Sequence, residues 1–292
     1  MRSETEQDKA RTKFLDNLKE LPTLPTVVAQ VMFTLDEPTS SARDLERLVI
    51  NDQAIAARLL KLANSAFYGL PGKVNSLSRA VTLLGFNTVR SLVLTIGIVN
   101  KFSGQSGTRL FDRGEFWEHS LSVAVASKLL CSKVNTVNPE EAHISGLLHD
   151  LGRVIMDNCM PDKFEKVIRL VLEKGMNPSE AELTVLGLTH CEAGAIAATK
   201  WHFPEFIRES MAYHHNPDEA VNFPVLVEGI HVADLIVKAF DGQEKAGEEL
   251  HFPEIDPDLK SRWLPTPRDE ELFMTKYEVE VERVQDIIAL FE

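Results

Sequence analysis

Apolar residues recur along most of the chain at intervals of three or four positions, which is the repeat of an amphipathic helix. Alternation of period two is almost absent, and no Asn-Gly or Asp-Gly pair stands between two alternating runs. The pattern therefore predicts an all-α, multi-helix protein. In the first third we expect six helices. The first covers about 6–19, and the second runs from Thr26 to a point before Pro38. The third follows a cap at Thr39, Ser40 or Ser41, the fourth begins at Asn51-Asp52, the fifth runs from Ser76 or Ser78 to Gly85, and the sixth covers 86–102.

A segment of small polar residues, Ser103-Gly-Gln-Ser-Gly-Thr108, interrupts this pattern and predicts a linker. Beyond it the pattern predicts helices over about 111–133, 139–158, 161–174, 178–186, 190–201, 204–213, 222–240, 256–263 and 268–290, with Asp241-Gly242 closing the one at 222–240. We therefore expect an N-terminal helical subdomain over 1–102 and a second subdomain over 109–240. The C-terminal loop and helices, over 241–292, should pack on the body.

The composition narrows the class of protein. Of 292 residues, 44% are apolar, enough for a packed core, and 44 acidic against 31 basic residues give a net charge of −13. That balance argues against direct nucleic-acid binding, which depends on clustered lysine and arginine. The three cysteines, Cys131, Cys159 and Cys191, form no CxxC pair, which is typical of a reduced, cytoplasmic protein. The longest apolar run, 91–99, predicts a buried helix and is too short for a membrane segment.

Side chains that commonly bind metal ions stand within the predicted helices of the second subdomain. They are Glu115, His119, His149, Asp150, His190, His214, His215 and Asp234, a set that holds five of the nine histidines. A buried carboxylate or imidazole is unfavourable without a partner, so this many ligand types on apolar helices indicate that a partner is present. Nitrogen and carboxylate ligands without cysteine suit iron, manganese or zinc, and Asp150 can bridge two ions.

The pair His149-Asp150 directly follows an apolar helical run. A metal ion would compensate for its burial. A salt bridge between Asp150 and Arg153, with His149 hydrogen-bonded in the core, would do the same. Gly152 permits a close backbone approach beside this pair. The two interpretations of the pair stay open.

The remaining positions are ambiguous when taken singly. Glu115 and His119 share one helix face at a spacing of four residues, which is common by chance. Asp234 lies in a mainly apolar helix with no basic residue nearer than Lys238, and an unpaired aspartate there favours a ligand role. Taken together, the positions favour a metal site.

In their order along the chain, His119, His149-Asp150 and Asp234 resemble the HD superfamily of metal-dependent phosphohydrolases. Adding His190 and His214-His215 makes the set similar to the two-metal HD-GYP branch. The resemblance implies two divalent metal ions that share Asp150 as a ligand. Iron or manganese is expected in preference to zinc. The resemblance assigns the first ion to His119, His149, Asp150 and Asp234, and the second to Asp150, His190, His214 and His215. Some members of that branch hold a third ion through a glutamate four residues before the first histidine, which Glu115 matches.

Six longer segments are similar to the HDOD family, the HD-related output domain, across roughly residues 15–240. They are Leu21-Pro-Thr-Leu-Pro25, Asn51-Asp-Gln-Ala-Ile-Ala-Ala-Arg-Leu-Leu-Lys-Leu-Ala-Asn-Ser65, Ala80-Val-Thr-Leu-Leu-Gly85, Phe116-Trp-Glu-His119, Gly146-Leu-Leu-His-Asp-Leu-Gly-Arg153 and Trp201-His-Phe-Pro204. The resemblance implies an HD/HDOD-type fold in which the N-terminal helical subdomain packs on an HD-like helical core. It also implies a bacterial, cytoplasmic protein of a signalling pathway, in a family whose members mostly have no assigned catalytic activity.

Departures from the HD-GYP pattern bear on function. The Gly-Tyr-Pro motif is missing after His215, where Asn216-Pro-Asp-Glu219 stands, and Arg153 replaces the lysine expected after His-Asp-x-Gly. No basic motif follows Asp234, because Leu235-Ile-Val-Lys-Ala-Phe240 stands there. By the resemblance, this chain keeps the metal ligands and loses recognition of cyclic di-GMP.

Three interpretations remain open at this point. The first is a regulatory protein with a two-metal site, whose partners are signalling proteins or a small nucleotide or phosphoester ligand, and which can form a homodimer. The second is a metal-dependent phosphohydrolase or phosphodiesterase acting on a nucleotide or cyclic dinucleotide, with Asp150 in the catalytic centre and Arg153 on a phosphate oxygen. The third is a purely structural cluster, which must satisfy its histidines and Asp234 without an ion. Whether the chain is an enzyme stays undecided.

Overall fold

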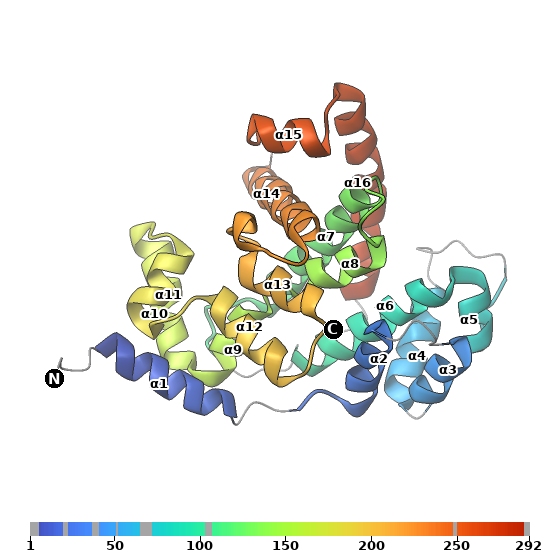
Figure 1. Ribbon diagram of the computed structural model, residues 1–292, viewed down its shortest axis with the longest axis horizontal. Coiled ribbons are helices and arrows are strands. Elements are labelled where there is room, and N and C mark those ends of the chain that lie inside the picture. Colours follow the sequence, from blue (N-terminus) through green and yellow to red (C-terminus); the bar gives the residue numbers. More distant parts are fainter. Residues whose placement is uncertain are drawn as a thin grey trace.

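The computed structural model describes residues 6–19, 23–36, 41–50, 52–64, 72–102, 107–247 and 250–288. Every regular element in these ranges is a helix, which confirms the predicted all-α fold (Figure 1). The first six helices are α1 (Glu6–Lys19), α2 (Thr26–Asp36), α3 (Ala42–Val49), α4 (Gln53–Ala63), α5 (Leu77–Leu84) and α6 (Phe86–Phe102). They are followed by α7 (Arg113–Cys131), α8 (Pro139–Leu148), α9 (Leu151–Cys159), α10 (Pro161–Lys174), α11 (Pro178–Leu186), α12 (His190–Lys200), α13 (Glu205–Tyr213), the 3₁₀ helix η1 (Pro217–Glu219), α14 (Pro224–Ala246), α15 (Pro257–Trp263) and α16 (Pro267–Ile288).

Helix starts follow simple capping chemistry. Six of the described α-helices begin at a proline, whose fixed φ and missing N–H suit the first turn. The side chains of Ser41, Asp52 and Ser76 accept hydrogen bonds from the first turns of α3, α4 and α5, as the sequence predicts. The other two predicted caps of α3, at positions 39 and 40, lie outside the described residues, as do positions 103–106 of the predicted linker.

Two predicted helix boundaries are wrong. The helix expected over 139–158 is divided into α8 and α9, because the backbone breaks at His149-Asp150. The helix expected to close at Asp241-Gly242 continues to Ala246 and ends at Gly247, whose φ of 71° forms the left-handed C-terminal turn. Both corrections matter for the site, since they place Asp150 at a helix junction and Asp241 inside a helix.

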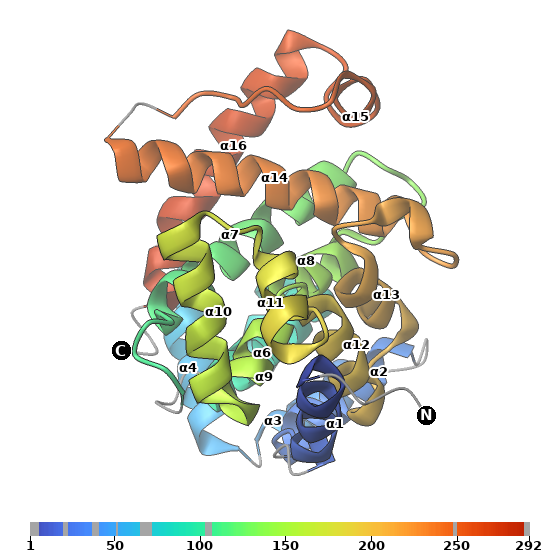
Figure 2. The same ribbon diagram turned by 90° about the vertical axis from the view of Figure 1, so that its left-hand side faces the viewer.

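Helices α7 and α8 lie side by side in the middle of the molecule, and α14 and α16 pack against α7 (Figures 1 and 2). Helices α2–α5 gather around α6 at one end. At the other end, α9 packs on α12, and α10 packs on α11. No described helix is both long and apolar enough to cross a membrane.

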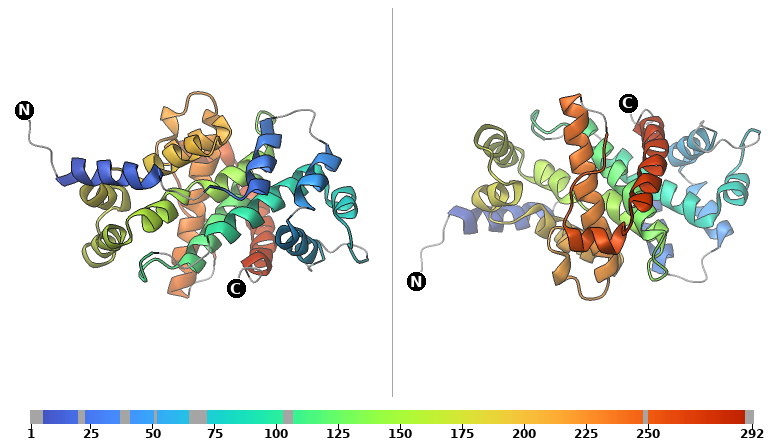
Figure 3. Two further views of the ribbon diagram at one scale, coloured as in Figure 1. Left: turned by 90° about the horizontal axis from the view of Figure 1, so that it is seen from below. Right: turned by 90° about the horizontal axis from the view of Figure 1, so that it is seen from above.

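Helix α1 lies far from the helices that follow it in the sequence and packs on α9 and α11 (Figures 1 and 3). Its Arg11 donates a hydrogen bond from Nη1 to the Gly187 carbonyl over 2.9 Å, and Asn17 donates from Nδ2 to the Cys159 carbonyl over 2.7 Å. The subdomain division near residues 103–108 stays a prediction. Helix α1 belongs to the predicted N-terminal subdomain, yet it contacts helices of the second one.

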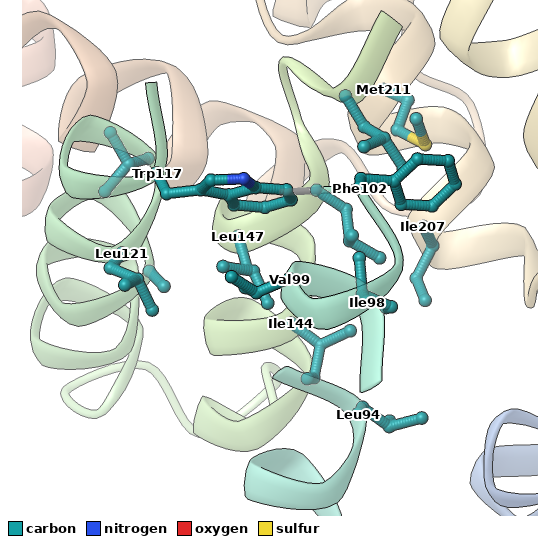
Figure 4. Close-up of a cluster of buried hydrophobic side chains, with 14 of the residues drawn as sticks. Leu94, Ile98, Val99, Phe102, Trp117, Leu121, Ile144, Leu147, Ile207 and Met211 are labelled. Carbon is teal, nitrogen blue, oxygen red and sulfur yellow. The ribbon is translucent and has the colours of Figure 1, made fainter. Parts of the chain in front are cut away.

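The core is continuous across these helices. Figure 4 shows Val99 and Phe102 of α6, Trp117 of α7, Leu147 of α8 and Ile207 of α13 meeting in one cluster. Nearly every side chain of the middle of α6 is buried, as the apolar run 91–99 predicts. Because the faces of α6, α7 and α8 are held on several sides, the ends of these helices are fixed in space.

Glycine permits the closest helix contact beside the helix junction. A Cβ atom at Gly152 would lie 1.9 Å from the His190 carbonyl oxygen and 3.0 Å from the Gly194 amide nitrogen. The start of α9 therefore packs backbone to backbone on α12, which confirms the close approach expected at Gly152.

We predict that Gly152→Ala destabilises the protein by about 3 kcal/mol, because α9 and α12 must separate to admit the methyl group. The matched control is Gly242→Ala in the exposed part of α14, where a Cβ meets nothing within 4 Å. That substitution should stabilise the protein by about 0.5–1 kcal/mol. Urea unfolding measures both, and equal effects would contradict the proposed close contact.

Candidate metal centre

The predicted ligands stand mainly at helix ends that meet at one point. His149 is the C-cap of α8, Asp150 precedes α9, His190 is the first residue of α12, and His214 is the C-cap of α13. Asp150 sits in the N-cap position of α9, yet its side chain makes no capping hydrogen bond. The side chain instead points at the histidines, so the Asp150 carboxylate belongs to the cluster and does not cap the helix.

The ligand atoms form two groups, each within 4.8 Å. One group consists of His119, His149 and Asp150, and the other consists of His190, Cys191, His214 and His215. Asp234 adjoins the first group, because its Oδ1 lies 3.1 Å from His119 Nε2 and 3.5 Å from His149 Nε2. The structure thus brings together seven of the eight predicted residues.

Asp150 lies between the two groups. Its Oδ1 is 3.1 Å from His190 Nε2 and 3.4 Å from His214 Nε2, whereas its Oδ2 is 3.7 Å from His149 Nε2 and 3.2 Å from Arg153 Nε. None of these contacts has hydrogen-bond geometry, and both oxygens are buried without a hydrogen-bond partner in the described part of the chain. Arg153 and the histidines outweigh the effect of burial and hold the pKa of Asp150 well below its usual range, so the carboxylate is charged.

Four histidines share one orientation, with Nδ1 facing an oxygen acceptor and Nε2 facing an aspartate. The acceptors are the Asp241 carboxylate for His119 (2.9 Å), the Gly146 carbonyl for His149 (2.7 Å), the Glu182 carboxylate for His190 (2.8 Å) and the Ser210 carbonyl for His214 (3.1 Å). Because each acceptor lacks a hydrogen, the Nδ1 atom carries the proton. This arrangement orients Nε2 as a ligand nitrogen, as partners behind metal-bound histidines do.

Three of the histidines are strongly basic without metal. For His190, Asp150 and Glu182 outweigh the effect of burial and hold its pKa well above the usual value. Burial opposes protonation of His119 and His214, but contacts with Asp234 and Asp150, respectively, outweigh it and raise both pKa values to about 9. These imidazoles partly neutralise the buried carboxylates. A metal ion would take over that neutralisation and displace the Nε2 protons.

The other members of the cluster differ. Burial lowers the pKa of His149, and burial together with His214 and His190 lowers that of His215 to about 2. Both imidazoles are therefore neutral near pH 7. The buried Nε2 of His149 has no hydrogen-bond partner in the described chain. This nitrogen carries a lone pair, and the Asp150 and Asp234 carboxylates that it faces have no hydrogen to donate to it.

One expectation from the sequence is wrong, and another, the third ion at Glu115, stays a prediction. Asp234 is not unpaired, since Lys238 lies one turn away on α14 and donates from Nζ to Oδ2 over 2.6 Å. Asp234 is thus satisfied without an ion. Glu115 belongs to neither ligand group, because its exposed carboxylate pairs with Lys245 Nζ at 3.1 Å. The ion pair expected between Asp150 and Arg153 is present, but it leaves His149 Nε2 without a partner.

Sequence reasoning missed three contributors. Cys191 was excluded from the ligand set, yet its Sγ lies 3.5 Å from His190 Nε2. Burial raises the pKa of this thiol, but His190 and His214 outweigh that effect and lower it to about 6. Glu182 and Asp241 hold His190 and His119 from behind. Tertiary packing brings Glu182 to His190, whereas Asp241 lies two helical turns after Asp234 on the same helix, which extends to Ala246.

A cavity of about 430 Å³ opens on the first ligand group. Its walls include His119, Asp150, Arg153 and Lys238, with Glu115 at its edge. Three cations, Arg153, Lys238 and Lys245, line this space together with six carboxylates, and its volume suits a small molecule.

Comparison with known proteins assigns most of the chain to a family. A family model for the HDOD domain matches residues 21–217. The chain belongs to the HDOD family. An HDOD domain protein of unknown function from Geobacter sulfurreducens has a similar crystal structure, with 28% identity, 96% coverage of both chains and a TM-score of 0.77.

Further solved structures share the fold. A candidate phosphohydrolase from Shewanella amazonensis SB2B is 22% identical, with a TM-score of 0.73 and coverage of 97% of this chain and 99% of that one. A candidate signal transduction protein from Marinobacter aquaeolei VT8 is 20% identical, with a TM-score of 0.76 and coverage of 100% of this chain and 67% of that one. An uncharacterized protein from Treponema pallidum is 24% identical over 242 residues. That match covers 82% of this HDOD chain and 46% of the relative, so the chain spans about half of the relative's length.

We predict that Glu182→Ala costs about 3 kcal/mol of unfolding free energy, because it removes one of the two carboxylates, Glu182 and Asp150, that compensate the charge of the buried His190. The control is Glu173→Ala, which removes an exposed ion pair with Arg169 and should change stability little. Urea unfolding of both variants distinguishes them. A negligible loss for Glu182→Ala would show that this carboxylate does not hold His190.

Proposed function

We propose that this HDOD protein is a regulatory protein whose helical core binds two divalent metal ions, one on each side of Asp150. The supporting observation is the buried, charged Asp150 carboxylate, which receives no hydrogen bond from the described residues while imidazole nitrogens face it from both sides. Two cations would give both oxygens and His149 Nε2 the partners they lack.

The proposed ligands follow the two groups. The first ion would be held by His119, His149, Asp150 and Asp234, and the second by Asp150, His190, His214 and His215. Imidazole and carboxylate ligands suit iron and manganese, and the neighbouring Cys191 thiol adds a ligand type that zinc accepts. Such ions lower the pKa of bound water and polarise phosphoryl oxygens. A third ion at Glu115 requires that the ion pair with Lys245 open first.

A regulatory role accords best with the sequence. The HD-GYP substrate motifs are absent after His215 and after Asp234, and one structural relative is a candidate signal transduction protein. The partners we propose are signalling proteins or a small nucleotide or phosphoester ligand, with a homodimer as the proposed assembly. The net charge of −13 disfavours a nucleic-acid partner.

Metal analysis of Asp150 variants tests the proposal. Protein purified without chelator should contain about two Fe or Mn per chain if the shared carboxylate bridges the ions. Asp150→Asn should lose both metals. Its control is Asp157→Asn, which changes another buried aspartate on α9 that pairs with an arginine, Arg113, outside the cluster. The control should retain its metal, with circular dichroism confirming that both variants fold.

Either of two results would contradict this proposal. The first is wild-type protein with less than about a tenth of the metal expected for two ligated sites, unchanged after anaerobic reconstitution. The second is an Asp150→Asn variant that keeps both ions.

A second candidate function is metal-dependent phosphohydrolysis, which the cavity beside the first ligand group favours. Arg153 lines that cavity with a side chain 24% exposed, and it is placed to bind a phosphate oxygen. Metal-loaded protein should then hydrolyse a nucleotide or cyclic dinucleotide. Arg153→Met should reduce that rate by about tenfold or more at unchanged metal content. If the metal-loaded protein hydrolyses none of cyclic dinucleotides, nucleotides and aryl phosphates, the second candidate function is wrong and only the regulatory function remains.

A further inference from the structure

A thiol stands among the imidazole nitrogens of the second ligand group. The Sγ atom of Cys191 lies 3.5 Å from His190 Nε2 and 3.9 Å from His214 Nε2, and the Nε2 atoms of His190 and His215 are 3.1 Å apart. One ligand atom from each of these four side chains lies within 4.8 Å of the others. Cys191 is buried. The thiol therefore shares the centre of this group with the three histidines.

These separations are those of ligands around one ion. Metal–nitrogen bonds of about 2.1 Å and a metal–sulfur bond of about 2.3 Å, in a tetrahedron, place two nitrogens about 3.4 Å apart and a nitrogen and a sulfur about 3.6 Å apart. The separations of 3.1 Å between two nitrogens and of 3.5 and 3.9 Å between nitrogen and sulfur differ from these values by about 0.3 Å or less. Little side-chain movement is then needed to bind a cation.

A second observation indicates that a cation belongs at this point. Asp150 is completely buried, and its Oδ1 lies 3.1 Å from His190 Nε2 and 3.4 Å from His214 Nε2. This oxygen has no hydrogen-bond partner among the described residues. A buried oxygen without a partner is unfavourable, and one ion can bind it together with the four side chains of the group.

Buried cysteines usually act as small apolar side chains, and Cys131 is an example. Cys131 is completely buried, and a Cβ atom at Gly229 would lie 2.8 Å from its Sγ, so this thiol fills space between α7 and α14. Cys191 differs, because imidazole nitrogens from two helix ends lie within 4 Å of its sulfur. Its surroundings are those of a ligand.

Local structure fixes the direction of this thiol. His190 and Cys191 are the first two residues of α12, in a turn closed by a capping box. Thr189 Oγ1 accepts a hydrogen bond from the Glu192 amide, and the Glu192 carboxylate accepts one from the Thr189 amide over 2.9 Å. Arg11 of α1 pairs with the same carboxylate at 3.0 Å. The turn that carries two ligand atoms is thus held in place without a metal ion.

We propose that Cys191 is a metal ligand, which makes the second site selective for zinc and other thiophilic divalent ions. This inference rests on the two-metal function proposed above and adds that the two sites are chemically different. The first group offers only nitrogen and oxygen atoms, which suit manganese and iron, whereas a thiolate favours zinc.

Charge compensation explains why a thiolate belongs on this side of the cluster. Asp150 is shared, whereas Asp234 adds its negative charge to the first group alone. Binding at the second site forms a metal–sulfur bond and breaks the Cys191 S–H bond, and the proton leaves to water without any transfer of electrons. Each ion then has one anionic ligand of its own besides the shared carboxylate.

Titration of the metal-free full chain with Co(II), without oxygen and under a phosphine reductant that keeps the thiols reduced, tests the proposal. We expect a sulfur-to-cobalt charge-transfer band in the near ultraviolet that stops growing at one equivalent, although the protein binds two cobalt ions. One equivalent of zinc should abolish the band, whereas an excess of manganese of about tenfold should leave it in place.

Cys191→Ser should remove the band and weaken cobalt binding at the second site by about tenfold or more, while the first site still fills. The matched control is Cys159→Ser, at the end of α9 opposite to Asp150, which should keep both the band and the affinity. Circular dichroism checks that each variant is folded. Cys191→Ala, with a smaller apolar side chain, replaces the serine variant if that variant does not fold.

The outcomes separate this inference from the proposed function. Two bound cobalt ions without a charge-transfer band, or a band that persists in the Cys191 variants, would overturn the role of Cys191 and leave the two-metal function standing. Equal loss of the band in Cys159→Ser, or displacement by manganese as readily as by zinc, would also overturn it. Failure of the wild-type protein to bind cobalt would contradict both proposals.

Discussion

The burial of Asp150 is the constraint on which the centre of this protein depends. A charged carboxylate closed off from water is unfavourable unless its surroundings compensate for it. Here the compensation comes from Arg153 and from imidazoles on separate helices, and none of these contacts is a hydrogen bond. The carboxylate is thus held in place by charge while its lone pairs stay available.

The fold supplies this arrangement through helix ends. The chain breaks between α8 and α9 at Asp150, α12 begins at His190, and α13 ends at His214. Gly152 lets α9 and α12 approach until backbone contacts backbone, which brings their first residues together. Behind the histidines, oxygens such as those of Glu182 fix the rings, so the site is organised by the protein before any ligand arrives.

Local chemistry explains what could be predicted from the sequence. The starts of α8, α10 and α11 agree with the prediction to the residue, and each lies at a proline, whose fixed φ suits the first turn. The starts of α14, α15 and α16 also lie at prolines but differ from the prediction by one or two residues. The break at Asp150 was missed because apolar residues continue on both sides of it. Seven of the eight site residues meet as expected, but Glu115 turns to Lys245, and the partners Glu182 and Asp241 depend on packing that sequence periodicity does not encode.

Anomalous X-ray diffraction from crystals of the full HDOD chain grown with manganese tests the central claim most directly. The account predicts two anomalous peaks, one on each side of Asp150, the first beside His149 and the second beside His190. A map without peaks at Asp150, in which the carboxylate receives hydrogen bonds from histidines or water instead, would contradict it.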